Sequence, residues 1–269
     1  MSTATRGYPD LHEHLAALDR AGLLVTIDEP VNKDTEMHPL VRWQFLGGIA
    51  EADRKAFLFT NIVDGKGTRF DLPMVVGALA ANAEIYGVGM GVPVADIQAK
   101  WAHAIANPIA PRMVDEAPCH EVVIEGDDLV GEGKGLEALP IPISSPGFDS
   151  APTLSATNVI TKDPETGVQN MGTYRAALKA SDRLVVRMAT RTGGAEGYLH
   201  WQKYKARGEE MPCAIVLGCP PYVAFMGPQK LPLGLDELDV AGGLAGEPIK
   251  GLEQLAAEGR IDLVIVIML

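Results

Sequence analysis

A proline-rich stretch divides this sequence into two halves with different hydrophobic patterns. Residues 107–118, "NPIAPRMVDEAP", contain three prolines and interrupt the helical periodicity that precedes them. Proline cannot continue a helix or donate a hydrogen bond to a sheet, so such a stretch is typical of a domain boundary. We therefore predict an N-terminal domain over residues 1–115 and a second domain over residues 116–269.

Helices and strands alternate in the N-terminal half. Leu11, Leu15 and Leu18 recur at helical spacing and Gly22 ends the pattern, which predicts a first helix. The remaining predicted strands lie at 23–30, 56–62 and 72–79, and the remaining predicted helices at 38–49, 82–89 and 94–106. This order predicts an α/β domain.

The second half is rich in short β-type runs separated by turn residues. "DPETG" at 163–167 and "ASD" at 180–182 are hairpin connectors, so we predict that the three strands around them form a meander. A helix at 197–210 interrupts the strands, and a short helix at 251–260 precedes an apolar final strand. The predicted strands of this half lie at 120–126, 153–163, 168–178, 182–190, 213–218, 222–227 and 261–269. Strands at this spacing predict a barrel or a sandwich.

Composition excludes several classes of protein. The formal net charge of −12 disfavours a nucleic-acid partner, because phosphate neutralisation needs a basic surface. No run of apolar residues has the length of a signal-peptide core or a membrane span, so we expect a cytoplasmic protein. Cys119, Cys213 and Cys219 form no C-x-x-C pair, and we expect reduced, buried thiols without a chemical role.

The segment "TGVQNMGTYR" at 166–175 holds the first candidate site residues. An amide oxygen such as that of Asn170 can ligate a hard divalent cation, although an Asn beside a hairpin turn more often serves the turn itself. Arg175 could clamp a carboxylate or phosphate, although an arginine on a strand is more often solvated. Strand alternation puts the two on opposite faces unless Gly172 introduces a bulge.

Acidic residues near a predicted helix start are the second candidate group. Asp236, Glu237 and Asp239 suit the positive end of a helix dipole, which is a sufficient structural reason for them. Glu237 could instead complete a Mg²⁺ or Mn²⁺ site with Asn170. His200 on the preceding predicted helix is more often a packed or surface residue than a ligand. Spacing alone does not decide between these readings.

In order and spacing, several segments together resemble the UbiD-like decarboxylases, which use prenylated FMN (prFMN) to add or remove CO₂ at unsaturated and aromatic acids. The resemblance runs from "DLHEHLAALDRAGLLVTIDEPV" through "LPIPISSPG" and "VITKDPETGVQNMGTYR" to "LPLGLDELDVAGGLAGEP". It implies a split β-barrel of the flavin-reductase type, preceded by an α/β domain. It also implies a cytoplasmic homo-oligomer supplied with cofactor by a flavin prenyltransferase.

The resemblance also implies roles for individual residues. Arg175 matches the catalytic arginine that faces the flavin and the substrate carboxylate. Asn170 and Glu237 match ligands of a divalent metal, Mn²⁺ or Mg²⁺, that bridges to the cofactor phosphate, and K⁺ is left open as a further ion. Lys230, in the loop "GPQKLPLG", adds a cation beside the cofactor. The residues implied to lie along the cofactor are Asn170, Met171, Gly172, Thr173, Tyr174, Arg175, Arg191 and Lys230.

Two departures from the family pattern qualify these roles. A gapless reading places Arg191 where the family supplies a histidine metal ligand, and arginine cannot ligate a metal in proteins. We prefer a site in which Arg191 partly replaces metal charge at the phosphate over one in which His200 swings in. After "LAGEPI" the likeness ends, so the glutamate that delivers the proton and the C-terminal α/β domain have no counterpart here. We therefore expect the chain alone to be incomplete for catalysis.

Three hypotheses about function follow. The leading one is reversible, non-oxidative decarboxylation of an aromatic or α,β-unsaturated carboxylic acid, such as a hydroxybenzoate-type acid or an aromatic acyl thioester. The alternative is a non-catalytic flavin-binding or assembly subunit of a decarboxylase complex, which the missing carboxylate favours. A generic flavin reductase is the third, and an NAD(P)H oxidation assay would distinguish it.

Overall fold

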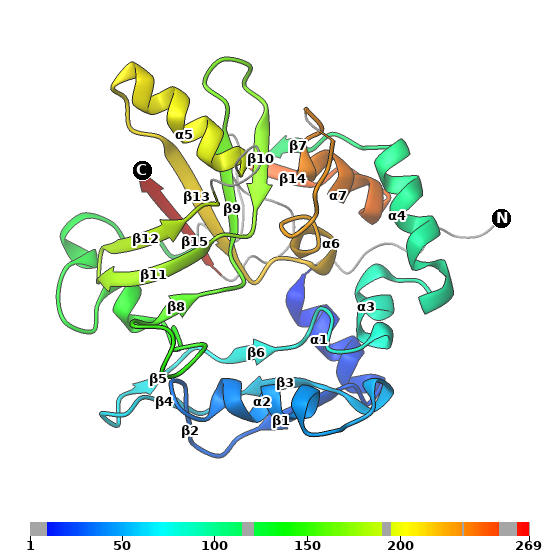
Figure 1. The fold of residues 1–269 in the computed structure, drawn as a ribbon, viewed down its shortest axis with the longest axis vertical. Helices are drawn as coiled ribbons and strands as arrows, with labels where there is room; N and C mark the ends of the chain where they lie inside the picture. The colour runs from blue at the N-terminus through cyan, green and yellow to red at the C-terminus, as the bar shows by residue number, and fades with distance from the viewer. Residues whose placement is uncertain (1–9, 115–120, 190–194, 233, 253–262, 269) are drawn as a thin grey trace.

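A computed structural model describes residues 10–114, 121–189, 195–232, 234–252 and 263–268. Figure 1 shows the elements of residues 11–76, in blue and cyan, below the green and yellow strands of the second half, and the helices of residues 83–106 beside the helices of residues 221–245. The fold is mixed helix and sheet, and the two halves share one apolar core. Within the described residues, no helix has the length and apolar character needed to cross a membrane.

The N-terminal half alternates helices with short strands, as predicted. Helix α1 (Leu11–Arg20) starts at Asp10, whose carboxylate accepts the Glu13 N–H at 2.7 Å, as an N-cap should. Strand β3 lies between a parallel β1 and an antiparallel β6. The remaining elements before residue 107 are β1 (Leu24–Ile27), β2 (Val31–Asn32), α2 (Met37–Leu46), β3 (Ala56–Phe59), β4 (Ile62–Val63), β5 (Arg69–Phe70), β6 (Met74–Val76), α3 (Ala83–Met90) and α4 (Ile97–Ala106).

Two sheets form most of the second half. One is antiparallel, in the order β10-β9-β13-β15, and the other has the order β12-β11-β8. Strands β7 and β14 pair in parallel, so the segment before residue 115 is tied to the end of the chain. The elements are β7 (Arg112–Val114), β8 (Thr153–Leu154), β9 (Asn158–Lys162), β10 (Gln169–Gly172), β11 (Arg175–Ala180), β12 (Arg183–Arg187), α5 (Glu196–Arg207), β13 (Pro212–Leu217), α6 (Pro221–Ala224), α7 (Glu237–Ala245), β14 (Lys250–Leu252) and β15 (Leu263–Met268).

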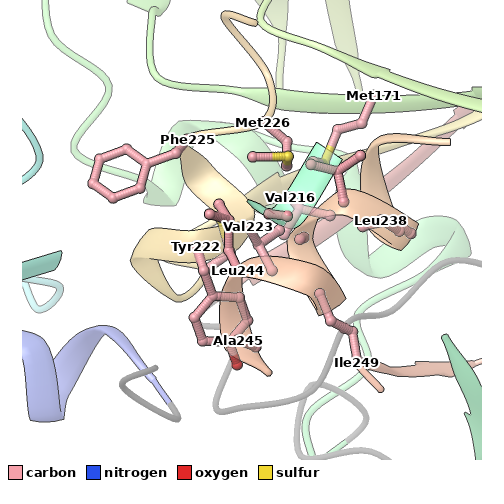
Figure 2. Packing of buried hydrophobic residues seen from close by; sticks show 14 of the residues in the cluster. Met171, Val216, Tyr222, Val223, Phe225, Met226, Leu238, Leu244, Ala245 and Ile249 are labelled. Atoms are coloured by element: carbon pink, nitrogen blue, oxygen red, sulfur yellow. The ribbon is translucent and has the colours of Figure 1, made fainter. Parts of the chain in front are cut away.

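The largest apolar core joins helices α6 and α7 to the four-stranded sheet. Met171 from β10 and Val216 from β13 are 2% and 1% exposed, and they pack with Met226 and Leu244. Figure 2 shows Met171 extending from its strand toward this helix pair. Strand β10 lies at the edge of the sheet, so one of its sides pairs with no described strand. This packing and helix α7 cover that side.

Several sequence-based expectations about the second half were wrong. The run at 120–126 forms no strand over its described residues, and Val122, Val123 and Ile124 are 74%, 66% and 56% exposed. High β-propensity does not make a strand where no neighbouring strand supplies cross-strand contacts. The run at 222–227 forms helix α6 instead of a strand, because Pro221 occupies its first position and presets a helical φ.

The meander was predicted only in part. The hairpins β9–β10 and β11–β12 form, but β10 and β11 lie in different sheets. The final strand forms as β15. The helix predicted at 251–260 was wrong at its start, because Gly251 and Leu252 belong to strand β14 and pair with β7, and residues 253–260 lie outside the described residues. The domain boundary at residue 115 stays a prediction.

Candidate functional site

The chain changes sheets within the segment that holds the candidate residues. Strand β10 ends at Gly172 and β11 begins at Arg175. Between them, the Thr173 N–H donates to the Gly227 carbonyl oxygen at 3.0 Å, which brings the loop after α6 against the crossing point. The register of β10 with β9 is continuous, so the separation of Asn170 from Arg175 comes from a change of sheet and not from a bulge at Gly172.

Gly172 is required at this crossing because the Tyr174 ring folds back over it. A β-carbon at position 172 would overlap the Tyr174 ring and its hydroxyl oxygen. That hydroxyl oxygen accepts the Asn170 Nδ2–H at 3.4 Å and the Gly197 N–H at 3.3 Å. Burial raises the pKa of the Tyr174 phenol, so the hydroxyl keeps a proton that it can donate.

Glu237 stands at the start of α7 and reaches the exposed edge of β10. Its Oε2 accepts the Met171 N–H at 2.9 Å, and only 5% of the residue is exposed. Asp236 caps the same helix by accepting the Leu238 N–H at 2.8 Å. The acidic pair therefore fulfils the helix-start role and also places one carboxylate on the backbone of Met171, the residue that follows the 5% exposed Asn170 on β10.

Burial dominates the electrostatics of this carboxylate cluster. It raises the pKa of Glu237 to about 7 and that of Asp236 to about 6. Hydrogen bonds from Met171 and Leu238 oppose the two shifts, and the charge of Glu196 adds to both. The neighbouring charges that raise the two pKa values most, among the described residues, are those of other acidic side chains. A buried carboxylate among acidic neighbours is a favourable position for a bound cation.

A metal site built from these residues has a suitable donor type and an incomplete ligand set. The Asn170 amide and the Glu237 carboxylate supply the oxygen ligands that Mn²⁺ and Mg²⁺ prefer. Among the residues that the structure describes, no group of three or more His, Cys, Asp or Glu side chains could hold a metal. Arg191 lies outside the described residues.

Arg175 faces a different partner, which sequence reasoning missed. Its Nη2 donates to Asp149 Oδ1 at 2.7 Å and to Oδ2 at 2.8 Å. The arginine side chain is 40% exposed, whereas that of Asp149 is 10% exposed. "LPIPISSPG", one of the segments that carry the resemblance, ends two residues before Asp149, but nothing in that segment singles out this carboxylate. The two residues are 26 positions apart, so no local sequence pattern indicates their pairing.

The other candidates lie in varied settings. Lys230 is exposed on the loop after α6, while Met171 places its side chain in the core and only its backbone beside Glu237. His200 is 2% exposed and its Nδ1 lies 2.9 Å from Thr161 Oγ1, which agrees with a packed residue. Cys213 and Cys219 are buried and are not joined in a disulfide, and Cys119 lies outside the described residues. The structure thus brings Asn170, Tyr174 and Glu237 together and directs Arg175 toward Asp149.

Comparisons with solved structures give long alignments. An evolved dimeric form of the UbiD-class enzyme HmfF from Pelotomaculum thermopropionicum, in complex with prFMN, has a TM-score of 0.80 and 28% identity, over 97% of this chain and 57% of its own. The apo 3,4-dihydroxybenzoic acid decarboxylase of Enterobacter cloacae has a TM-score of 0.77 and 25% identity, over 98% of this chain and 54% of its own. The vanillic acid decarboxylase of Sedimentibacter hydroxybenzoicus in closed form has a TM-score of 0.79 and 23% identity, over 97% of this chain and 53% of its own. At this identity it supports the fold alone. This chain thus spans slightly more than half the length of each.

A family model gives the same result from sequence. The model of the UbiD family, described as a 3-octaprenyl-4-hydroxybenzoate carboxy-lyase Rift-related domain, matches residues 112–261. That range continues past "LAGEPI", where we expected the likeness to end. It includes every candidate residue from Asn170 to Glu237 and more than half of the chain, which therefore belongs to the UbiD family.

Proposed function

We propose that this chain takes part in the reversible, non-oxidative decarboxylation of an aromatic or α,β-unsaturated carboxylic acid with prFMN as cofactor. UbiD-class enzymes are decarboxylases, and the HmfF relative is complexed with prFMN. The observation that carries the proposal is the placement of Glu237 on the Met171 backbone, next to Asn170, with Arg175 following directly after the change of sheet.

Each residue has a stated role in this proposal. Asn170 and Glu237 hold Mn²⁺ or Mg²⁺, whose further ligands come from a phosphate or from residues outside the described part, and K⁺ is a possible second ion. The peptide from Asn170 to Arg175 lies along the cofactor, and Lys230 and Arg191 add positive charge at its phosphate. When bound, prFMN supplies the electron sink for the carbon chemistry.

Arg175 orients the substrate in this proposal. Its guanidinium binds the carboxylate that leaves as CO₂, and such positioning can lower a barrier by several kcal/mol. The Tyr174 hydroxyl, which accepts two hydrogen bonds, keeps its proton to donate toward the same region. The core beneath Met171 excludes water from that side of the strand.

Wider features of the proposal follow from the family. We propose that the two sheets of the second half belong to a split barrel of the flavin-reductase type after an N-terminal α/β domain. We also propose a cytoplasmic homo-oligomer, for which the dimeric form of the HmfF relative gives support. A flavin prenyltransferase would supply the cofactor.

The test is loading of the chain in cells that also make a flavin prenyltransferase. We expect purified protein to carry prFMN, identified by its absorbance and by mass spectrometry, and about one Mn²⁺ per chain by elemental analysis. Glu237→Gln should lose most of the Mn²⁺ and keep the fold. Glu165→Gln is the matched control, because that carboxylate is 56% exposed on the β9–β10 turn. Absence of both flavin and Mn²⁺ from the wild-type chain would contradict the proposal.

CO₂ release from a panel of aromatic and unsaturated acids then separates the two leading candidates. Release by the loaded chain supports the decarboxylase. Retention of prFMN without release from any acid supports a flavin-binding or assembly subunit.

A further inference from the structure

A short connecting segment reaches from the N-terminal half to the sheet that carries Arg175. This strap, residues 141–153, is anchored at its start by two hydrogen bonds from neighbouring residues of the N-terminal half. Lys33 Nζ donates to the Ile141 carbonyl oxygen at 2.8 Å, and the Ile143 N–H donates to Asp34 Oδ1 at 2.9 Å. Lys33 is 6% exposed and pairs with Asp34 at 2.9 Å. A partly buried ion pair thus fixes the strap to the N-terminal half.

The strap closes on itself at a compact turn. The N–H groups of Phe148 and Asp149 both donate to the Ser145 carbonyl oxygen at 2.9 Å. The Ser145 N–H in return donates to Asp149 Oδ2 at 3.0 Å, and Gly147 supplies the left-handed φ of +81° that the turn needs. The Asp149 carboxylate is therefore held by its own turn before any contact with Arg175 is made.

Asp149 engages only part of the Arg175 guanidinium. Nη2 alone donates to both carboxylate oxygens, at 2.7 and 2.8 Å. Within the described part of the chain, neither Nη1 nor Nε of Arg175 makes a hydrogen bond to the protein, and a guanidinium carries five N–H donors in a rigid fork. The two N–H groups of Nη1 and the single N–H of Nε are thus left to donate to a second carboxylate, at Nη1 without displacing Asp149 from Nη2.

The other titratable neighbour of Asp149 contributes little positive charge. His38, on α2, interacts electrostatically with Asp149, but burial lowers the pKa of its imidazole. It is therefore mostly neutral at pH 7, and Arg175 is the cation that pairs with Asp149 among the described residues.

We propose that Asp149 is a positioning residue that holds Arg175 by Nη2 so that the unused N–H donors of Nη1 meet the substrate carboxylate. The inference rests on the proposed function, because it assigns the orientation of the arginine in that reaction. A 40% exposed arginine has many accessible rotamers, and a fixed carboxylate at one nitrogen removes most of them before substrate arrives. Through the strap, the N-terminal half thereby sets the geometry of the site.

Two readouts test this role in the cofactor-loaded 269-residue chain. The first is the rate at which phenylglyoxal, an arginine-specific reagent, modifies Arg175, followed by peptide mass spectrometry. Asp149→Ala should raise that rate about fivefold, because the guanidinium loses its ion-pair partner. The second is CO₂ release, in which Asp149→Ala should lower kcat about tenfold and leave KM within about threefold of wild type.

Two further variants keep the test independent of folding. Asp149→Asn retains an acceptor for Arg175 and for the Ser145 N–H, so it should lie between wild type and Asp149→Ala in both readouts. Asp182→Asn removes the carboxylate of the exposed Arg183–Asp182 pair, at 3.3 Å, on the turn between β11 and β12, and should change neither. Circular dichroism checks that each variant is folded.

The outcomes separate this inference from the proposed function. An unchanged phenylglyoxal rate in both Asp149 variants overturns the role of Asp149, whatever the activity. A rise in KM with kcat intact, or an equal effect of Asp182→Asn, also overturns it. A wild-type chain that carries prFMN and releases no CO₂ agrees with the expectation that this chain alone is incomplete for catalysis, and the labelling rates then decide by themselves whether Asp149 holds Arg175.

Discussion

Asn170 and Arg175 stand five residues apart in the chain but lie in opposite surroundings. Asn170 is 5% exposed on an edge strand that Glu237 and the core close off from water. Arg175 has a 40% exposed side chain and pairs with a carboxylate from the distant strap. The change of sheet at residues 173 and 174 makes this difference. The segment 170–175 thus has a buried, dry end at Asn170, which suits a cation. It has a solvent-exposed, wet end at Arg175, which suits a carboxylate that can exchange.

The difference should appear most strongly in the pH dependence of stability of the metal-free chain. Burial raises the pKa of Glu237 from an ordinary value of 4.5 to about 7, so between these pH values the folded state binds more protons than the unfolded state. Its contribution to the free energy of unfolding therefore falls as pH rises from 4.5 to 7, by on the order of 3 kcal/mol. Urea unfolding in EDTA at pH 5 and pH 7.5 measures the fall.

Glu237→Gln isolates that contribution. The amide oxygen can still accept the Met171 N–H but has no proton to lose, so the fall should shrink by the amount due to Glu237. Asp236, whose pKa is raised to about 6, should contribute its own smaller fall in the free energy of unfolding in both proteins. Buried histidines with lowered pKa values act in the opposite direction and cancel in the difference; they are His14, His38 and His200. If the free energy of unfolding changed with pH equally in both proteins, the Glu237 carboxyl would not be in a water-excluded environment.

Sequence patterns anticipated the local elements better than their assembly. The leucine spacing of α1 and the turn at 163–167 are short-range signals, and both elements formed where they were predicted. The sheet switch could not be read from alternation, because it depends on the Tyr174 ring over Gly172 and on Gly227 from a segment far along the chain.

The candidate site shows the same limit. Glu237 was identified through its helix-start position and the family resemblance, and its contact with Met171 spans 66 residues of chain. Asp149 lies in a turn whose sequence, with Ser145 and Gly147, is typical of many solvated turns. Only the fold reveals that this turn presents a carboxylate to Arg175.

Gly172→Ala tests the point at which the chain changes sheets, between the buried end and the exposed end of the segment. The added β-carbon would overlap the Tyr174 ring, so the ring must move and lose its hydrogen bonds with Asn170 and Gly197. We expect a loss of about 1–3 kcal/mol in the free energy of unfolding, measured with urea at pH 7. Gly65→Ala is the matched control, since the nearest atom to its β-carbon is 3.9 Å away. Equal stability of the two variants would mean that the ring does not pack on Gly172.

Arg175→Ala should have the smallest effect on stability, although it removes the residue proposed to be catalytic. An ion pair with one side chain 40% exposed is screened by water, so its loss should cost no more than about 1 kcal/mol in the free energy of unfolding. A double-mutant cycle with Asp149→Ala measures the coupling between the two side chains directly. The same variant should leave the pH difference between wild type and Glu237→Gln nearly unchanged, because burial is the largest cause of the raised pKa values of Glu237 and Asp236. A coupling as large as the effect at Gly172 would place Arg175 in a dry environment and remove the contrast between the two ends of the segment.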